Sequence, residues 1–362
     1  MSKEFKSKID VQSESFLKNR AEMLKKIKEM RNLEKRSFNA SESKRKKFED
    51  RNQLTPRERL NALIDTDSEF IELYNMAGFL VEDNNPETSI PGASVIAGIG
   101  FIKGVRCMIM VDDSGINAGA ATSTTVDKCV GCLEISLEKK LPFVHLVESA
   151  GINLMNYKVE IWARAGGMFA GLAKLSAAGV PTITILHGLS TAGGAYNVGM
   201  SDYVIGVKKN GMAALAGPAL LKAATNEVAS NKELGGSEMH ATVSGLVEYL
   251  AEDDSDAIDI ARNVVNALDW NSGFSTIKDN DYIEPKYDID EIAGIVNLDY
   301  KKPYDAREII LRLVDDSSFI EFKPRYGITT LCFQADINGN SCGIVANNGP
   351  IDTDGATKSA QF

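Results

Sequence analysis

Two turns of small residues, each directly after a short apolar run, carry the clearest chemical signal in the chain. The run FVHLV at 143–147 is followed by ESAG at 148–151, and the run TITIL at 182–186 by HGLSTAGGA at 187–195. Glycine and alanine leave the backbone N–H groups of such turns accessible to a ligand. Fixed N–H groups stabilise an oxygen that becomes negatively charged during a reaction. The pattern therefore predicts a site whose donors are backbone amides.

A strand–helix–strand unit must position these turns. The two apolar runs predict buried strands, and residues 162–178 have apolar and small residues at helical spacing, with Gly179 and Pro181 as stop signals. Ligands of such α/β units bind at the carboxyl ends of the parallel strands, where both turns lie. A helix that begins near Ala195 would add its N-terminal amides to the second turn.

Composition indicates a globular chain without membrane or secretion signals. Of the 362 residues, 44% are hydrophobic and 25% are charged, and no apolar run approaches the length of a membrane span. We therefore expect a cytoplasmic protein with no membrane partner. The net charge of −10 is uneven, since residues 1–50 hold fifteen Lys or Arg and nine Asp or Glu. The mixed signs of this segment and the acidic remainder argue against binding of nucleic acid.

Two other arrangements have the spacing of reactive sites but favour simpler interpretations. Cys129 and Cys132 are spaced as in metal or redox sites, yet they lie in an amphipathic helix pattern with no second pair or His nearby. We expect them to pack in the core and expect no bound metal. Ser190 lies in a near match to the nucleophile turn of hydrolases, without a paired acid and histidine to activate it. We expect His187 to be structural rather than a base.

Turn and charge signals divide the chain into four segments. Residues 1–50 predict a charged helical arm with a thin apolar stripe, which needs a partner surface. Residues 51–270 predict a domain that starts with a helix capped by Thr55 and contains a hairpin around Lys103-Gly104 as well as the strand–helix–strand unit. Residues 271–302 are rich in Asp and predict a linker. Residues 303–362 begin a second domain.

The last segment repeats an earlier part of the chain. Residues 307–321 correspond to 57–72, with one residue fewer between the matching ends, and 337–344 matches 102–109 without a gap. The repeat predicts two copies of one fold. The second copy stops before any counterpart of 142–202, so we expect one complete domain and one incomplete copy.

Several long motifs occur in order: STAGGAYNVGMSDY at 190–203, the segment 216–254, and IVANNGPIDTDGATKSAQF at 344–362. With these motifs the chain resembles the carboxyltransferase (β) subunit of biotin-dependent acyl-CoA carboxylases, nearest to the methylcrotonyl-CoA and geranyl-CoA type. The resemblance runs from about Arg51 to the C-terminus. It implies an α/β fold of the crotonase-like kind, a ββα superhelix, with a complete N-terminal domain and an incomplete second copy.

The resemblance also implies a reaction. Carboxybiotin, carried on a separate chain or domain, releases CO₂; the freed biotin nitrogen takes the proton beside the thioester carbonyl of acyl-CoA; and backbone N–H groups hold the enolate. Carried over by motif, Gly193 and Gly194 form the oxyanion hole. The residues that line the same pocket are Ser149, Ala150, Gly151, Ala192 and Ala195. The implied partners are a biotin carboxylase and biotin carboxyl carrier subunit, and further copies of the chain in a homo-oligomer.

Two departures from the family pattern keep alternatives open. The family has a Lys-Gly-Gly turn and an Arg in the next helix, both placed to bind CoA phosphates. In this chain the turn is Asn117-Ala118-Gly119, and Gly131 stands near the Arg position. Lys128 could compensate for the two missing cations. The second oxyanion hole, for biotin, belongs to the part that the second copy lacks. We expect the chain alone to bind acyl-CoA weakly and to need a second chain for turnover. The alternatives are a non-catalytic or split carboxyltransferase-like partner subunit, or a crotonase-type acyl-CoA hydratase or thioesterase, which would need only one copy of the fold.

Overall fold

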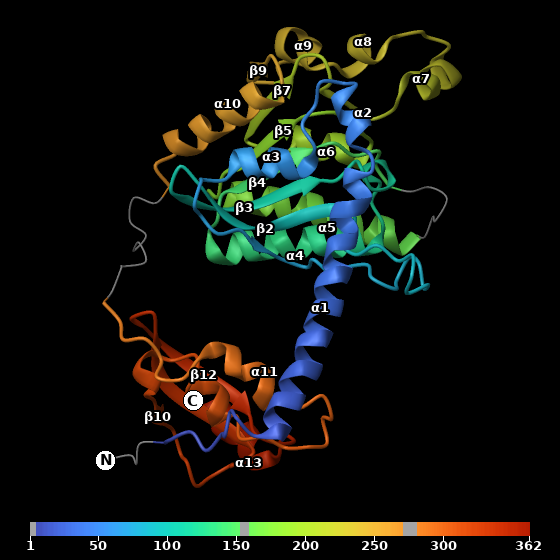
Figure 1. Cartoon of the computed structure of the whole chain (residues 1–362). Helices are drawn as coiled ribbons and strands as arrows, with labels where there is room; N and C mark the ends of the chain where they lie inside the picture. The colour runs from blue at the N-terminus through green and yellow to red at the C-terminus, as the bar shows by residue number, and fades with distance from the viewer. Residues whose placement is uncertain (1–4, 153–158, 271–280) are drawn as a thin grey trace. The chain divides into compact units, whose positions relative to one another are not determined.

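The computed structural model describes residues 5–152, 159–270 and 281–362 (Figure 1). Its contacts divide it into a larger unit, Asn32–Phe274, and a smaller unit that joins Met1–Arg31 to Ser275–Phe362. The long helix α1 (Glu14–Glu42) contributes its first part to the smaller unit and its last part to the larger one. Among the described residues, no helix is long and apolar enough to cross a membrane.

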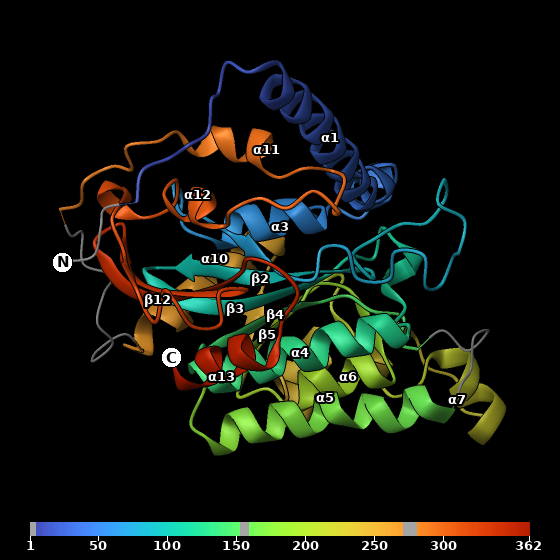
Figure 2. The ribbon, with the colours of Figure 1, turned by 90° about the horizontal axis from the view of Figure 1, so that it is seen from below.

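A mixed seven-stranded sheet forms the centre of the larger unit (Figure 2). In sheet order its strands are β1 (Ile71–Glu72), β2 (Val95–Ile102), β3 (Val105–Asp112), β4 (Phe143–Val147), β5 (Thr182–Leu186), β7 (Tyr203–Val207) and β9 (Tyr249–Ala251). The first three are antiparallel, and each later neighbour is parallel. The two apolar runs are β4 and β5, with the bounds that the sequence predicted. The hairpin is also confirmed, since Lys103 and Gly104 have the positive φ angles, 51° and 75°, of a two-residue turn.

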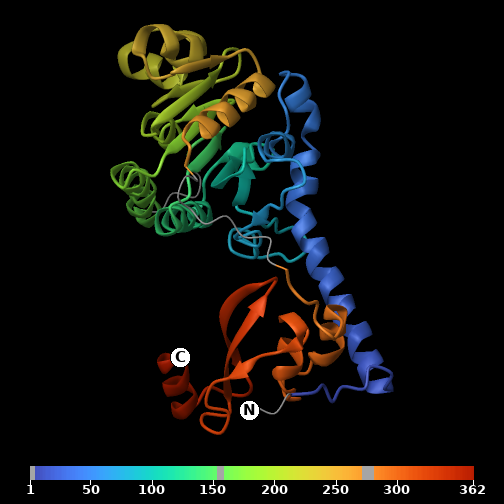
Figure 3. The ribbon, with the colours of Figure 1, turned by 90° about the vertical axis from the view of Figure 1, so that its left-hand side faces the viewer.

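Helices cover both faces of this sheet (Figure 3). On one face α3 (Pro56–Leu63) and α10 (Asp254–Ala267) pack on a core that includes Ile109 of β3. On the other, α4 (Ser123–Lys139) and α5 (Val159–Ala177) pack on a core that includes Met108. Cys129 and Cys132 belong to this second core, where burial raises the pKa of Cys132 to about 11. The prediction that the two cysteines pack is confirmed.

Shorter elements lie around the ends of β4 and β5. A small parallel sheet pairs β6 (Leu189–Thr191) with β8 (Met212–Ala214). The other short elements are α2 (Arg45–Glu49), α6 (Gly193–Gly199), α7 (Pro218–Thr225), α8 (Asn231–Gly235), α9 (Ser237–Met239), a 3-10 turn at Asn117–Gly119 and a π-helix at His240–Ser244. Helix α6 begins two residues before the predicted start, so both glycines of the second turn lie in its first turn.

The smaller unit contains a three-stranded antiparallel sheet. Its elements are α11 (Ile292–Ile295), α12 (Arg307–Ile310), β10 (Ile320–Glu321), β11 (Thr330–Ile337), β12 (Asn340–Asn347) and α13 (Thr353–Gln361), with 3-10 turns at Ile289–Glu291 and Asp315–Ser317. Residues 281–302, predicted as part of a linker, carry α11 with Ile295 buried, and 271–280 lie outside the described residues. The four-segment division of the chain stays a prediction.

The repeat predicted from the sequence is confirmed by equivalent ion pairs in the two units. In the larger unit Arg57 donates to both oxygens of Glu72, at 2.7 and 2.9 Å. In the smaller unit Arg307 donates to both oxygens of Glu321, at 2.6 and 2.9 Å. The elements from α3 to α4 thus have counterparts from α12 to α13. The described part of the smaller unit has no counterpart of β4 to β9.

A second shared feature is the carboxylate that holds each hairpin turn. Asp65 accepts the N–H groups of Lys103 and Gly104, at 2.8 and 2.7 Å. Asp315 accepts those of Asn338 and Gly339, at 2.9 and 2.7 Å. The hairpins differ at their outer edge: β3 pairs with β4, whereas β12 has no such neighbour within the described residues.

Candidate active site

The loops that follow β3, β4 and β5 meet at one edge of the larger unit's sheet. The Ala150 N–H donates to the Ala118 carbonyl at 3.2 Å, which joins the first loop to the second. The Thr191 N–H donates to the Ser149 carbonyl at 3.2 Å, which joins the second loop to the third. The two small-residue turns therefore lie together, as their positions after parallel strands predicted.

The second turn presents two backbone N–H groups that have no internal acceptor. Ala192, just before α6, has φ 49° and ψ −114°, and its own N–H donates to the Ala214 carbonyl at 3.1 Å. Gly193 and Gly194 begin α6, and N–H groups in a first helical turn have no helical acceptor. No other acceptor reaches them within the part of the chain that the structure describes. Both N–H groups therefore lack an acceptor among the described residues.

Gly193 leaves open space beside its backbone, whereas Gly194 is buried and packs against the first turn. A Cβ on Gly193 would meet only Phe169 Cζ, at 3.9 Å. A Cβ on Gly194 would lie 3.4 Å from Ser149 Cβ, so this glycine contacts the first turn. Ala195 follows in α6 and is buried. The predicted residues of the two turns are thus brought together in one place.

The first turn lies against the second, and the N–H groups of its Ala150 and Gly151 are already bonded within the protein. The Ala150 N–H is used by the loop after β3, and the Gly151 N–H donates to Ser149 Oγ at 3.2 Å. Ser149 Oγ in turn donates to the Gly119 carbonyl at 2.8 Å. Gly151 has a φ of +81°, a conformation that other residues rarely adopt.

Lys128 lies apart from these residues. Its side chain is buried, and Nζ donates to the carbonyls of Gly92, at 3.2 Å, and Val95, at 2.6 Å. Burial lowers its pKa. Lys358 has the same place in α13 as Lys128 has in α4, six residues after the N-cap, and is also buried. We interpret Lys128 as support for the loop before β2, and its role in binding substrate stays a prediction that this burial does not favour.

A basic pocket opens beside the first turn. It has a volume of about 170 Å³ and is lined in part by Glu148 and Ala150. Its cationic lining residues are Lys44, Lys47 and Arg51. The sequence analysis assigned the first two to a helical arm, although the run KRKK at 44–47 was a signal of concentrated positive charge. These side chains place cations near the site, whereas the loop after β3 contains no Lys or Arg.

An apolar hollow adjoins α6. It has a volume of about 570 Å³ and includes Ala195 of the second turn. Most of its other lining residues are aliphatic: Ala213, Ala214, Leu215, Ala216, Leu220, Leu221, Ala224, Leu234 and Leu246. Such a lining suits an apolar group that enters beside the Gly193 and Gly194 N–H groups.

A set of buried charged side chains supports the two turns, and the sequence analysis missed it. Arg59 of α3 is 1% exposed; it donates from Nη1 to Glu148 Oε2, at 2.6 Å, and from Nε to Asp254 Oδ2, at 2.9 Å. Asp254 Oδ1 lies 2.8 Å from His187 Nδ1. Burial acts to raise the pKa of Asp254, but His187 and Arg59 hold it well below its usual range, and burial lowers the pKa of His187. The carboxylate is therefore ionised, and the neutral imidazole donates to it.

Ser190 and His187 do not form a nucleophile and a base. Both side chains are fully buried. Neither Ser190 Oγ nor His187 Nε2 has a hydrogen-bond partner within the described residues, so the imidazole does not reach the hydroxyl. Hydrolysis through Ser190 has no support in this geometry.

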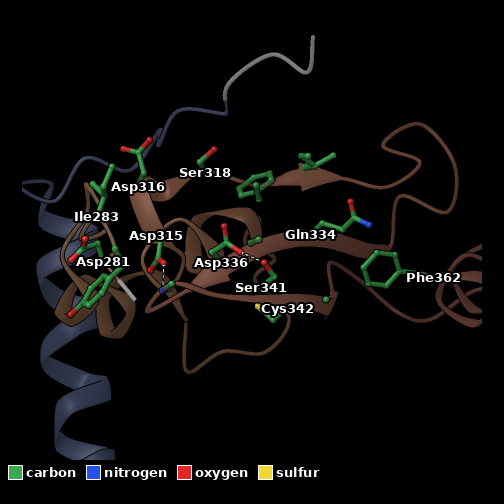
Figure 4. Close-up of a pocket in the computed structure, with 16 residues that line it drawn as sticks. Asp281, Ile283, Asp315, Asp316, Ser318, Gln334, Asp336, Ser341, Cys342 and Phe362 are labelled. Carbon is green, nitrogen blue, oxygen red and sulfur yellow. Dashed lines mark hydrogen bonds between the residues drawn. The ribbon is translucent and has the colours of Figure 1, made fainter. Parts of the chain in front are cut away.

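The smaller unit has a large hollow of about 940 Å³ with different chemistry (Figure 4). Its acidic lining residues are Asp281, Asp315, Asp316 and Asp336. Three of them are used within the protein: Asp315 holds the hairpin turn, Asp316 pairs with Lys286 at 3.0 Å, and Asp336 accepts from Ser341 Oγ at 2.5 Å. The negative charge disfavours an anionic ligand. Across the described parts of the chain, no three His, Cys, Asp or Glu residues are grouped so as to hold a metal ion.

The class of protein follows from a mixed sheet that has, at one edge, two glycine N–H groups without an acceptor among the described residues. Residues 47–362 match the family model for the carboxyl transferase domain, and the chain belongs to this family, as its motifs predicted. Solved carboxyltransferase structures of this kind match it, and its fold is their crotonase-like α/β fold.

Three relatives that are similar to most of this chain are β subunits of acyl-CoA carboxylases. A probable biotin-dependent acyl-coenzyme A carboxylase β2 subunit of Mycobacterium tuberculosis is 43% identical over 317 residues, which cover 86% of this chain and 58% of the relative. The mitochondrial methylcrotonoyl-CoA carboxylase β chain of Dictyostelium discoideum is 38% identical over 358 residues, which cover 98% of this chain and 60% of the relative. The crystal structure of the P. aeruginosa geranyl-CoA carboxylase β subunit matches with 43% identity and a TM-score of 0.90, over 99% of this chain and 66% of that one. The chain thus spans less than two thirds of these relatives.

Proposed function

We propose that the chain is a carboxyltransferase subunit of a biotin-dependent acyl-CoA carboxylase. The observation that carries the proposal is the pair of Gly193 and Gly194 N–H groups, which have no acceptor within the described residues, together with the open space beside Gly193. In the proposed reaction a carboxyl group passes from carboxybiotin to the carbon next to the thioester carbonyl of an acyl-CoA. That carbon loses a proton first, which leaves an enolate.

The two glycine N–H groups would hold the negatively charged enolate oxygen. Bound biotin would supply the CO₂ and the basic nitrogen, so the chain needs no nucleophile or base of its own. The absence of such a need agrees with the state of Ser190, whose side chain is buried and has no hydrogen-bond partner within the described residues. The proposed lining residues are Ser149, Ala150 and Gly151 from the first turn and Ala192 and Ala195 from the second.

The CoA phosphates would bind the basic pocket beside the first turn. Lys44, Lys47 and Arg51 line it, and ammonium and guanidinium groups are strong phosphate partners. We assign this role to them rather than to Lys128, whose Nζ is used by two carbonyls. The acyl group would enter the apolar hollow beside α6, which fits the apolar acyl groups named in the methylcrotonoyl-CoA and geranyl-CoA relatives.

The proposal also covers partners and location. We propose a biotin carboxylase and biotin carboxyl carrier subunit as the partner. We also propose a homo-oligomeric assembly, for which the transcarboxylase 12S structure, described as a hexamer, is the precedent. Cytoplasmic location stays part of the proposal, and the Dictyostelium discoideum relative is mitochondrial by its name.

Substitution of Gly193 by valine tests the oxyanion hole. The new side chain fits the fold, because nothing but Phe169 Cζ lies within 4 Å of its Cβ, but it covers the space beside the N–H groups. We expect carboxyl transfer in the complex with the biotin-carrying partner to fall by roughly 100- to 1,000-fold, the effect of losing one oxyanion donor. The control is Gly199→Val at the other end of α6, where a Cβ also meets nothing within 4 Å. Full activity of a folded Gly193→Val variant would overturn the assignment.

A split or non-catalytic carboxyltransferase-like subunit is the second candidate, because the loop after β3, at 113–122, holds no Lys or Arg for the CoA phosphates. The same assay separates the two when it is run with and without a polypeptide that supplies the remaining part of a relative. Activity only with that polypeptide indicates a split enzyme. Acyl-CoA binding by calorimetry without transfer in either case indicates a non-catalytic partner.

A further inference from the structure

We infer that Arg59 is a positioning residue for the proposed reaction: it fixes the loop that carries the Gly193 and Gly194 N–H groups against the 148–151 turn. The inference rests on the function proposed above. Arg59 lies in α3 and contacts neither glycine, so it would act only through the groups that it holds.

Arg59 is a buried cation between two buried carboxylates. The side chains of Arg59, Glu148 and Asp254 are 1%, 5% and 3% exposed. Loss of one partner from such a set leaves an uncompensated charge away from water, which is strongly unfavourable. Burial acts to lower the pKa of Arg59, but the attraction of Glu148 and Asp254 raises it above its usual value. The guanidinium is therefore a fixed charged bridge between its two partners.

Glu148 connects the ends of three strands. Its N–H donates to Oδ2 of Asp112, the last residue of β3, at 3.1 Å, while its carboxylate is held by Arg59. Its side chain also fills the space over Gly188, directly after β5, where a Cβ would lie 2.5 Å from Glu148 Cδ. Glu148 therefore determines how closely the second and third loops approach each other.

Asp254 fixes the third loop from the other side. It binds Arg59 with Oδ2 and His187 Nδ1 with Oδ1, so the histidine before Gly188 is held by its ring. The carbonyl of the same histidine accepts from Gln53 Nε2 at 2.9 Å. The glycine N–H groups follow a few residues later in this loop. Their position relative to the first turn thus depends on the two bonds of Arg59, and a displacement of about 1 Å at such donors costs roughly 100-fold in rate.

The test compares Glu148→Gln with a matched control in the smaller unit. Arg312 is also 1% exposed between two carboxylates, Glu308 at 3.2 Å and Glu291 at 2.6 Å, so Glu308→Gln removes the same charge at the same depth. The probe is a nitroalkyl analogue of an acyl-CoA, whose nitronate carries negative oxygen where the enolate would. Calorimetry on the full chain gives the dissociation constants of the nitronate and of the parent acyl-CoA.

We expect the wild-type chain to prefer the nitronate, and Glu148→Gln to lose about 10- to 100-fold of this preference. The preference is the ratio of the two dissociation constants, because Glu148 also lines the pocket proposed for the CoA phosphates, which both ligands carry. Removal of a nearby negative charge alone would strengthen binding of an anion, so a loss must come from the position of the donors. Glu308→Gln should keep the preference. Gly188→Ala, whose Cβ displaces the Glu148 side chain without removing its charge, should show the same loss.

Hydrogen exchange separates this inference from the proposed function. In Glu148→Gln, but not in Glu308→Gln, the amides of 188–199 should exchange faster than in the wild type. Unchanged exchange in Glu148→Gln overturns the inference, and so does an unchanged nitronate preference where the wild-type chain shows one. Faster exchange in a chain whose wild type shows no nitronate preference supports the role of Arg59 in fixing the loop and overturns the function instead.

Discussion

Among single residues, His187 makes the stability of the fold depend on pH. Burial lowers its pKa below the value of about 6.5 that an exposed histidine has. Between the two values the unfolded chain binds a proton that the native chain does not, so the free energy of unfolding decreases as the pH falls below about 6.5. Above that pH the contribution is complete. Asp254 adds no change in this range, because its carboxylate is ionised in both states.

We expect His187→Asn to reduce this pH dependence. Asparagine can still donate to Asp254 but does not titrate, so the variant should lose less stability than the wild type between pH 6.5 and 5.5. One proton accounts for at most about 1.4 kcal/mol per pH unit. Urea unfolding at pH 5.5 and 7.5 measures the difference between the two chains. Equal slopes for both would show that His187 is protonated in the native state or does not titrate in this range.

At this scale the sequence predicted the glycine amides but not the residues that support them. Gly193 and Gly194 stand in one short motif after one strand, so their type and position were visible. Arg59 meets Glu148 across 89 residues and Asp254 across 195, and spacing in the chain cannot show such pairs. The burial of Lys128 was hidden for the same reason, because its acceptors, the Gly92 and Val95 carbonyls, lie more than 30 residues earlier in the chain, at the start of β2.

At the scale of elements, local signals predicted most of the larger unit. The Thr55 cap forms as a capping box with Glu58, as the sequence predicted. Helix α1 shows where periodicity is insufficient. Its predicted apolar stripe stays largely exposed, whereas Phe16, which lies directly on Gly294, and Asn19, which bonds to the Gly294 carbonyl at 2.8 Å, are buried. The face of α1 that is buried is therefore the one that contacts Gly294, and the spacing of apolar residues along α1 does not show this tertiary contact.

The exposed stripe of α1 predicts a contact in an assembly. Leu17, Leu24, Ile27 and Met30 are 51%, 41%, 42% and 50% exposed, and apolar surface of this kind favours association. We expect Leu24→Glu combined with Ile27→Glu to lower the mass of the oligomer in sedimentation at an unchanged melting temperature. Lys25→Glu, on the opposite side of the helix, is the control for charge. An oligomer of unchanged mass would remove α1 from the interface.

At the scale of the whole chain, the two copies of the hairpin differ in burial. In β3, Ile109 and Met110 are 0% and 1% exposed. In β12, the corresponding Ile344 is half-buried and Val345 is 54% exposed. The difference follows from the neighbours, because β3 pairs with β4 and β12 has no equivalent strand within the described residues. Unpaired strand edges and uncovered apolar faces favour binding of another segment.

We expect a polypeptide that supplies the relatives' counterpart of residues 142–202 in the second copy to bind this edge. At a concentration of 100 times its dissociation constant it should stabilise the smaller unit by about 2.7 kcal/mol. Thermal unfolding and hydrogen exchange of β12 measure the effect, with the corresponding segment of the first copy as a control polypeptide. If the β12 amides exchange at the same rate with and without it, the edge is not the binding site.

The paired Arg57–Glu72 and Arg307–Glu321 forks also bear on ancestry. Two copies of one fold in one chain have their simplest origin in duplication of a gene segment, and a feature present in both copies then predates the duplication. The forks, which join α3 to β1 and α12 to β10, and the Asp65 and Asp315 turns, which hold the hairpins, are such features. These interactions are therefore at least as old as the duplication itself.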